Sequence, residues 1–352
     1  MQRSISITLT IAMAMALTVG AQAQSITWTE KGGSVGSGNW FIPKVASDGS
    51  QSLVVIGQNG TGLVPLEYQT GVYPNYATSI NWNATDNSYT AGEAPSVAMN
   101  VDPYYDDIAV EVHQGGQNNG AALWSHIAQT TGEFGSTIPW NSGDEYDTGY
   151  NPTVAMDPFW TGLGGSTSVV EVHQAGKNLS NLWYHVGTLA YDSSFNLTLT
   201  WGPAYQFDYG YVPSVSMCGG VAVEVHEGNP GTLWYSVGTV SGNKVNWSAS
   251  TQYDSGYNPS VSATCNPGTL VEVHQGQNPG VGKSSKLWYH VAPYSSSGVS
   301  WTPAKEYDTG CYPTATIFYG YMISDSGWVG ETHTEVCGKA SALDYDLGTL
   351  IP

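Results

Sequence analysis

A carboxylate and an imidazole recur two residues apart along this chain, in the pattern Glu-x-His. On an extended strand, residues two apart point to the same face, so each glutamate lies beside its histidine while the flanking valines face the other way. Such a pair could act as a general acid and base, or supply ligands to a metal ion. The copies are Glu111 with His113, Glu171 with His173, Glu224 with His226, Glu272 with His274, and Glu331 with His333.

Recurrence favours a structural role for this pair, because an enzyme seldom needs several copies of one dyad. A buried polar pair must be hydrogen-bonded, and a strand inside a repeat protein packs against the neighbouring repeat. We therefore interpret Glu-x-His as a contact between adjacent repeats, and contact with a ligand at these boundaries is the alternative. We assign no catalytic residue, no metal site and no cofactor, and we expect the chain not to be an enzyme.

A second motif, Tyr-Asp-x-Gly-Tyr-x-Pro, begins at Tyr146 and Tyr253, with variants beginning at Phe207 and Tyr307. Asp-x-Gly is typical of a turn in which the carboxylate caps nearby N–H groups and glycine adopts a positive φ. Tyrosine rings with carboxylates and amides around them would also fit the apolar face and hydroxyl rim of a sugar. The candidate ligand-binding residues are Tyr146, Asp147, Tyr150, Asp208, Tyr211, Asp254, Tyr257 and Asp308, with Gln114, Gln174 and Gln275 from neighbouring loops.

A third motif, Leu-Trp-Tyr or a relative of it, follows each of the first four Glu-x-His copies. Its tryptophans are Trp124, Trp183, Trp234 and Trp288. Because large aromatic side chains contribute much of their energy when buried, we expect these indoles to pack between repeats rather than to form a binding platform.

The elements that position these motifs are short strands in a repeat of roughly 50 to 60 residues. Each repeat opens with a Pro-led strand, continues through the Glu-x-His and Leu-Trp-Tyr strands, and ends in a strand finishing with tryptophan. Gly, Asn, Ser and Asp separate the segments, as turns require. Repeats one to six open at Pro43, Pro95, Pro152, Pro213, Pro259 and Pro313. The pattern predicts an all-β fold, a six-bladed β-propeller with four-stranded blades.

The two ends of the chain predict how this ring closes. Repeat six stops after its third strand, at 343–348, and lacks the strand that should end in tryptophan. Residues 25–29 contain Ser-Ile-Thr-Trp, which matches the missing strand. Because open strand edges invite aggregation, we expect the N-terminal strand to close the last blade.

The four cysteines all lie in the second half of the chain, and the expected topology predicts how they pair. Cys218 and Cys265 each follow a Pro-led strand in neighbouring repeats, at one face of the ring. Cys311 and Cys337 both belong to repeat six, at the opposite face. Other pairings would join opposite faces, beyond the reach of a disulfide, so we predict Cys218–Cys265 and Cys311–Cys337.

Composition narrows the location and the partners. Residues 1–23 have a positive charge, an apolar run and an Ala-x-Ala cleavage signature, which predicts a signal peptide followed by one domain over 24–352. We expect a secreted, periplasmic or cell-surface protein with no membrane span. With 28 acidic against 9 basic residues, nucleic acid is an unfavourable partner, because binding it relies on Lys and Arg.

In its exported, repetitive and Trp- and Tyr-rich character, the chain resembles propeller lectins of the tachylectin and fucose-lectin kind. The resemblance implies multivalent carbohydrate binding, with glycans or another cell-surface or extracellular partner. Fucose-binding propellers use an arginine in each site, but Arg3 is the only arginine here and lies in the predicted signal peptide. Fucose specificity is therefore not implied. The alternatives are a protein-interaction or cell-envelope scaffold, or a polysaccharide hydrolase or lyase using residues of repeat six such as Asp325 or His333.

Overall fold

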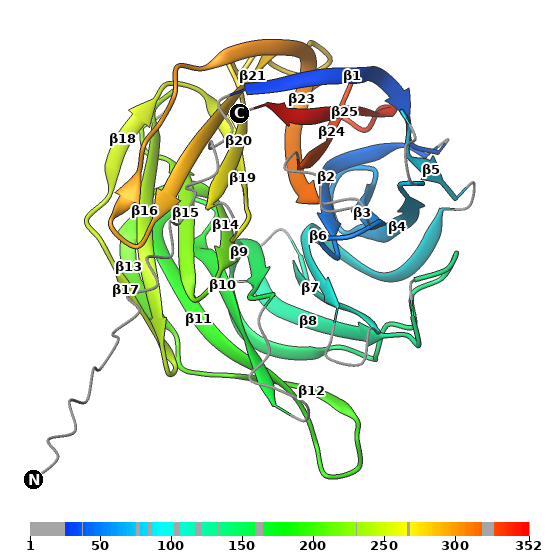
Figure 1. Cartoon of the computed structure of the whole chain (residues 1–352), viewed down its shortest axis with the longest axis vertical. Coiled ribbons are helices and arrows are strands. Elements are labelled where there is room, and N and C mark those ends of the chain that lie inside the picture. The colour runs from blue at the N-terminus through cyan, green and yellow to red at the C-terminus, as the bar shows by residue number, and fades with distance from the viewer. Residues whose placement is uncertain are drawn as a thin grey trace, which may run out of the picture.

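The described part of the chain is built from strands alone. The computed structural model describes residues 25–351 apart from 37, 75–77, 84–85, 102–105, 117–120, 133, 159–164, 230, 266–267 and 319–326, so the predicted signal peptide and Asp325 lie outside the described residues. Figure 1 shows the sheets arranged around a common centre. Within the described residues, no helix could cross a membrane.

The strands of the N-terminal half of the chain follow one another without a helix between them, and all except β1 belong to repeats one to three. They are β1 (Ser25–Ser34), β2 (Trp40–Ser47), β3 (Ser52–Asn59), β4 (Val64–Val72), β5 (Asn81–Trp82), β6 (Asn87–Val101), β7 (Asp107–Gln114), β8 (Ala121–Gln129), β9 (Asp144–Met156), β10 (Ser166–Gly176), β11 (Leu179–Tyr191), β12 (Leu197–Trp201) and β13 (Tyr205–Tyr209).

The last three repeats continue in the same way. Their strands are β14 (Tyr211–Cys218), β15 (Val221–Glu227), β16 (Leu233–Ser241), β17 (Lys244–Trp247), β18 (Thr251–Asp254), β19 (Tyr257–Ala263), β20 (Thr269–Gln275), β21 (Ser285–Ser295), β22 (Gly298–Val299), β23 (Lys305–Phe318), β24 (Trp328–Thr334) and β25 (Leu343–Ile351).

Each repeat forms an antiparallel unit whose strands pair in chain order. In repeat two, β6 pairs with β7, β7 with β8, and β8 with β9. The strands β6, β9 and β23 are long because each leaves the outer edge of one unit and continues as the inner strand of the next. We number the units as the repeats, one to six.

The Pro-led strands lie innermost, as expected. Residues of β2, β6, β9, β14, β19 and β23 together line a cavity of about 490 Å³. Small and medium side chains such as Ala98, Ala155 and Ser216 face it, which allows six strands to meet closely. The valines of the second strands are fully buried, as Val110 and Val112 show, so the apolar core lies between successive units.

The N-terminal strand joins the last unit. β1 pairs antiparallel with β25, with Ser25 opposite Ile351 and Trp28 opposite Gly348. Trp28 also stacks on Tyr307 at 4.9 Å between ring centroids, and Trp201 stacks on Tyr146 at 5.0 Å in the same way. The tail thus provides unit six with the tryptophan-bearing outer strand that its own sequence lacks.

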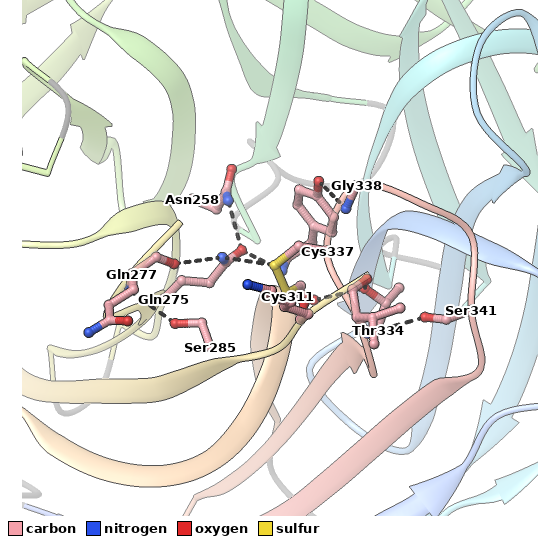
Figure 2. The surroundings of a disulfide bond; sticks show 12 residues. Asn258, Gln275, Gln277, Ser285, Cys311, Thr334, Cys337, Gly338 and Ser341 are labelled. Atoms are coloured by element: carbon pink, nitrogen blue, oxygen red, sulfur yellow. Dashed lines mark hydrogen bonds between the residues drawn. A yellow bond between two sulfur atoms is a disulfide. The ribbon is translucent and has the colours of Figure 1, made fainter. Parts of the chain in front are cut away.

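Both predicted disulfides are confirmed. Cys218–Cys265 joins units four and five across 5.3 Å between Cα atoms. Cys311–Cys337 lies within unit six, with its Cα atoms 5.2 Å apart (Figure 2). Two disulfides are typical of a protein from an oxidising compartment.

The Asp-x-Gly segments are not the turns that we predicted. Asp147 pairs with Leu123 and Gly149 with Ala121, so this motif is an extended outer strand. Its glycine does not have a positive φ; in each unit the positive φ belongs to the residue directly before the Pro, such as Asn151 or Val212. The glycine is needed instead for close contact with the next unit, as shown below.

Candidate binding site

The Glu-x-His pairs lie buried at the boundaries between units. Glu171 is fully buried, and both of its oxygens lie 3.1–3.2 Å from Nδ1 of His173. The Tyr146 hydroxyl of the preceding unit lies beside the same carboxylate, and burial together with Glu171 raises the pKa of this tyrosine well above its usual range. Tyr89 with Glu111, Tyr253 with Glu272 and Tyr307 with Glu331 repeat the arrangement.

The aspartate of the second motif reaches across the same boundary. Oδ1 of Asp147 accepts a hydrogen bond from the N–H of Thr148 at 2.8 Å, which is the local capping expected of this residue. Its Oδ2 lies 2.7 Å from Nε2 of His185 and 3.8 Å from Nε2 of His173. One carboxylate of unit two therefore faces two imidazoles of unit three.

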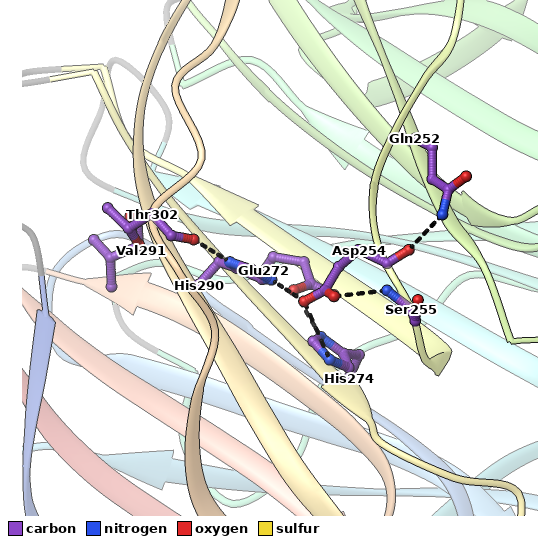
Figure 3. A network of polar contacts seen from close by, with 8 residues as sticks. All are labelled: Gln252, Asp254, Ser255, Glu272, His274, His290, Val291 and Thr302. Carbon is purple, nitrogen blue, oxygen red and sulfur yellow. Dashed lines mark hydrogen bonds and ion pairs between the residues drawn. The ribbon is translucent and has the colours of Figure 1, made fainter.

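The boundary between units four and five repeats this constellation (Figure 3). Oδ2 of Asp254 lies 2.8 Å from Nε2 of His290 and 4.0 Å from Nε2 of His274. The two imidazoles are stacked with their centroids 5.7 Å apart. The second histidine of each set lies on the Leu-Trp-Tyr strand, directly across from the glutamate.

The contact between Asp147 and His185 changes the pKa of both groups. Burial disfavours the ionised form of Asp147, but hydrogen bonds from His185 and Thr148 outweigh it, and the pKa of this carboxyl is lowered. Burial likewise disfavours protonation of His185, yet its contact with Asp147 outweighs burial and raises the pKa of the imidazole. The ionised carboxylate of Asp147 and the protonated imidazole of His185 therefore stabilise each other where the two units meet.

The three candidate glutamines lie apart from these aspartate–histidine contacts, and their side-chain carbonyl oxygens already accept hydrogen bonds. The backbone N–H of Asn151 donates to Oε1 of Gln114, and that of Val212 donates to Oε1 of Gln174, both at 2.9 Å. The N–H of Tyr312 donates to Oε1 of Gln275 at 2.8 Å. These three glutamines are 1 % exposed, so their carbonyl oxygens join each unit to the next instead of facing solvent as we expected.

The candidate tyrosines divide into two groups. Tyr146 and Tyr253 stack on Trp201 and Trp301 between units, and their hydroxyls are buried. Tyr150, Tyr211 and Tyr257 are half-buried at the start of the inner strands, opposite Gln174, Glu227 and Gln275. The aspartates Asp208 and Asp308 share the outer-strand position of Asp147, and each accepts its following N–H group.

The tryptophans of the third motif are not the packing residues that we expected. Trp124, Trp183, Trp234 and Trp288 are only partly buried. Among the described residues they take part in neither the aromatic stacks nor the apolar clusters that join the units. Each lies directly across from the histidine of Glu-x-His, as Trp124 does from His113. The alternation of side chains along the two paired strands could have predicted that each indole lies on the same face of the sheet as this histidine.

At the boundary between units one and two, this arrangement lines an open recess of about 280 Å³. His113, His126 and Trp124 line it from unit two, while Thr90 and Leu63 line it from unit one. The two imidazoles stack with their centroids 5.5 Å apart. Thr90 occupies the position that Asp147 and Asp254 hold at the later boundaries. The recess thus combines an indole wall, a pair of imidazoles and a hydroxyl.

The motif glycine allows this close approach. A Cβ atom on Gly149 would lie 2.5 Å from Cδ2 of His173, and the same contact recurs between Gly256 and His274. No real Cβ packs this closely, so a side chain at either position would force the units apart.

We expect Gly149→Ala to lower the free energy of unfolding by about 1–3 kcal/mol, the usual cost of overpacking a core. Chemical denaturation of the purified variant measures the change. Gly116→Ala is the matched control, because a Cβ there meets nothing within 4 Å. Equal stability of the two variants would contradict the close contact.

No family model matches the chain, and no curated protein matches it in sequence. Solved structures do match in fold. A protein of unknown function from Dyadobacter fermentans is 11% identical with a TM-score of 0.54, over 93% of this chain and 99% of its own. The Aleuria aurantia lectin, a six-bladed β-propeller with a fucose recognition mode, is 10% identical with a TM-score of 0.56, over 90% and 98%.

A neuraminidase-like protein of a bat influenza virus, subtype N11, is 8% identical with a TM-score of 0.50, over 94% of both chains. At such identities the likeness concerns the fold alone. The chain therefore resembles propeller lectins in architecture, and its all-β fold is that of a β-propeller.

Proposed function

We propose that this chain is an exported, multivalent carbohydrate-binding protein, with its ligands held in the recesses between neighbouring units. In this proposal residues 1–23 are the signal peptide and residues 24–352 form one six-bladed propeller, closed by β1. The observation that carries it is the repeated, partly buried tryptophan beside buried histidines, which around Trp124 line a recess.

The chemistry of the recess suits a sugar. An indole face packs against the apolar C–H face of a pyranose ring, as aromatic side chains do with other apolar surfaces. Imidazole nitrogens and the hydroxyl of Thr90 can donate to or accept from sugar hydroxyls. A small recess of this kind binds one sugar weakly, but several recesses on one rigid ring bind a glycan-coated surface with high avidity.

The resemblance to the Aleuria aurantia lectin supports the architecture of this proposal. It does not extend to fucose, because the chain after Arg3 contains no arginine to provide the site of such lectins. The acidic charge of the chain, −19 at pH 7, also favours neutral over anionic glycans.

A glycan array probed with the mature chain tests the proposal, followed by titration calorimetry with the sugars that bind. We expect Trp124→Ala to weaken binding at its recess by about 1–2 kcal/mol, a 5- to 30-fold rise in Kd, because buried tryptophans dominate binding sites. A variant with all four tryptophans replaced should lose binding to the array.

Phe195→Ala is the control for this series, because Phe195 is also an exposed aromatic residue, at 76 % exposure, but belongs to the hairpin between β11 and β12. Its glycan binding should equal that of the unchanged protein. Full binding by the four-tryptophan variant, or no binding by the folded parent to any glycan, would reject the proposal.

A further inference from the structure

Two of the boundaries bring together an aspartate and two imidazoles, a set that the recess around Trp124 does not contain. Asp147, His173 and His185 have potential ligand atoms within 4.8 Å of one another, and so have Asp254, His274 and His290. The histidine side chains are 2–5% exposed, while Asp147 and Asp254 are 29% and 30% exposed. Each set is buried on the imidazole side and open on the carboxylate side.

Nδ1 of each of the four imidazoles already has a hydrogen-bond partner. Nδ1 of His185 lies 2.8 Å from the carbonyl oxygen of Gly202, and Nδ1 of His173 lies 3.1 Å from the Glu171 carboxylate. In the second set, Nδ1 of His290 faces the carbonyl oxygen of Thr302 and Nδ1 of His274 faces Glu272 (Figure 3). A carbonyl or carboxylate oxygen only accepts, so each Nδ1 carries the hydrogen.

Nε2 of a neutral imidazole held in this way presents a lone pair. In both sets the two Nε2 atoms converge on one carboxylate oxygen, which also carries only lone pairs. A cation is therefore needed between them, either a proton that Nε2 donates to the carboxylate, as in the hydrogen bond from His185 to Asp147, or a metal ion. Histidines that bind metals in proteins usually donate their other N–H to a carboxylate or backbone carbonyl, as all four do here.

We propose that the boundary between units two and three and the boundary between units four and five each bind one zinc ion. The ligands are Nε2 of His173 and His185 with the carboxylate of Asp147, and Nε2 of His274 and His290 with the carboxylate of Asp254. Two imidazoles, one carboxylate and an open fourth position make a known type of zinc site. The open position faces the solvent side of the aspartate.

The ligand atoms need only small side-chain rotations to reach a tetrahedral ion. With zinc–ligand bonds of about 2.0–2.2 Å, ligand atoms lie about 3.4 Å apart, and the partly exposed carboxylates of Asp147 and Asp254 have room to rotate away from the nearer Nε2. This inference does not depend on glycan binding, because zinc binding is measured directly and without a sugar present.

Three other boundaries each lack one member of this aspartate–imidazole–imidazole set and serve as internal controls, and in two of them a buried glutamate lies close to the histidine. Between units one and two, His113 and His126 are present but Thr90 replaces the aspartate. Between units three and four, Asp208 and His226 are present but Ser236 replaces the second histidine. Unit six has His333 as its one imidazole beside Asp346. All eight histidines of the chain belong to these boundaries, so no other imidazole competes.

Zinc alone, added to the tag-free, metal-stripped chain, tests the proposal by equilibrium dialysis with elemental analysis. We expect two zinc ions per chain, one in Asp147→Asn or Asp254→Asn, and none in the double variant. Thr90→Asp completes the first boundary and should raise the stoichiometry to three. Cobalt substitution gives a second readout, since a tetrahedral His–carboxylate site produces visible absorption bands that the double variant should lose.

Circular dichroism and thermal unfolding show whether each variant is folded, and Asp144→Asn, an exposed residue of the same strand as Asp147, controls for loss of charge. Folded protein that binds no zinc would show that the cation between these groups is a proton, and would overturn the proposal. Zinc bound equally by the double variant would show adventitious binding, and would also overturn it. Glycan binding can fail in the array without affecting either result.

Discussion

A chain lacking residues 25–34 is expected to lose its cooperative unfolding transition and to aggregate. Without β1, the outer edge of β25 is left with a row of unpaired backbone groups, and exposed edges of this kind pair with other chains. Unit six would also lose Ile26, which is buried, and Trp28, which stacks on Tyr307. We expect this to be the largest effect of any change considered, because it affects backbone pairing and core packing together.

Size-exclusion chromatography and thermal denaturation of the truncated chain measure the loss. A synthetic peptide of residues 25–34, added during refolding, should restore a monomer, since the register of β1 on β25 is fixed by several backbone pairs. A peptide of the same composition in scrambled order should not. A truncated chain that stays monomeric and unfolds at the parent's temperature would contradict the role of β1.

Replacing Glu111 by alanine is expected to lower the free energy of unfolding by about 3–5 kcal/mol, the cost of removing one partner from a buried polar network. Glu111 is fully buried, and both of its oxygens lie 3.1 Å from Nδ1 of His113. Its loss leaves that imidazole and the buried hydroxyl of Tyr89 without their carboxylate. Denaturant unfolding monitored by tryptophan fluorescence gives the value.

Two further variants separate the contributions in this network. Glu111→Gln keeps the shape and one acceptor oxygen, so it should cost less than Glu111→Ala. Tyr89→Phe removes only a hydroxyl and should cost about 1 kcal/mol. A loss below about 1 kcal/mol for Glu111→Ala would mean that the carboxylate is dispensable and that packing alone joins the two units.

Long-range features of the fold were predictable because they follow from repetition. The period fixed the number and order of strands in each repeat, and the incomplete last repeat pointed to the pairing of β1 with β25. The cysteine positions, read against that topology, gave both disulfides. None of these inferences needed to know which side chain faces which neighbour.

The candidate site was harder to predict, because strand alternation gives two faces without saying which one the next unit covers. Gln174 looked exposed beside a glycine-rich loop, but the following unit covers it. Trp183 looked like core, but it is only partly buried and lies directly across from His173. The role of Gly149 depends on its 2.5 Å approach to His173, a contact between strands of different units that a single sequence does not reveal.

The residues before the prolines have a consequence for how the protein unfolds. Ile42, Ala94, Asn151, Val212, Asn258 and Tyr312 all adopt the left-handed backbone conformation. That conformation is unfavourable for branched and aromatic side chains such as Ile42, Val212 and Tyr312. In five of the six cases a Gln or Glu of the preceding unit accepts the N–H group. A blade that separates from the preceding blade therefore loses the Gln or Glu oxygen whose hydrogen bond offsets the strain of its own left-handed residue. Partial melting of one module should spread around the circle, so loss of structure should be all-or-none instead of module by module.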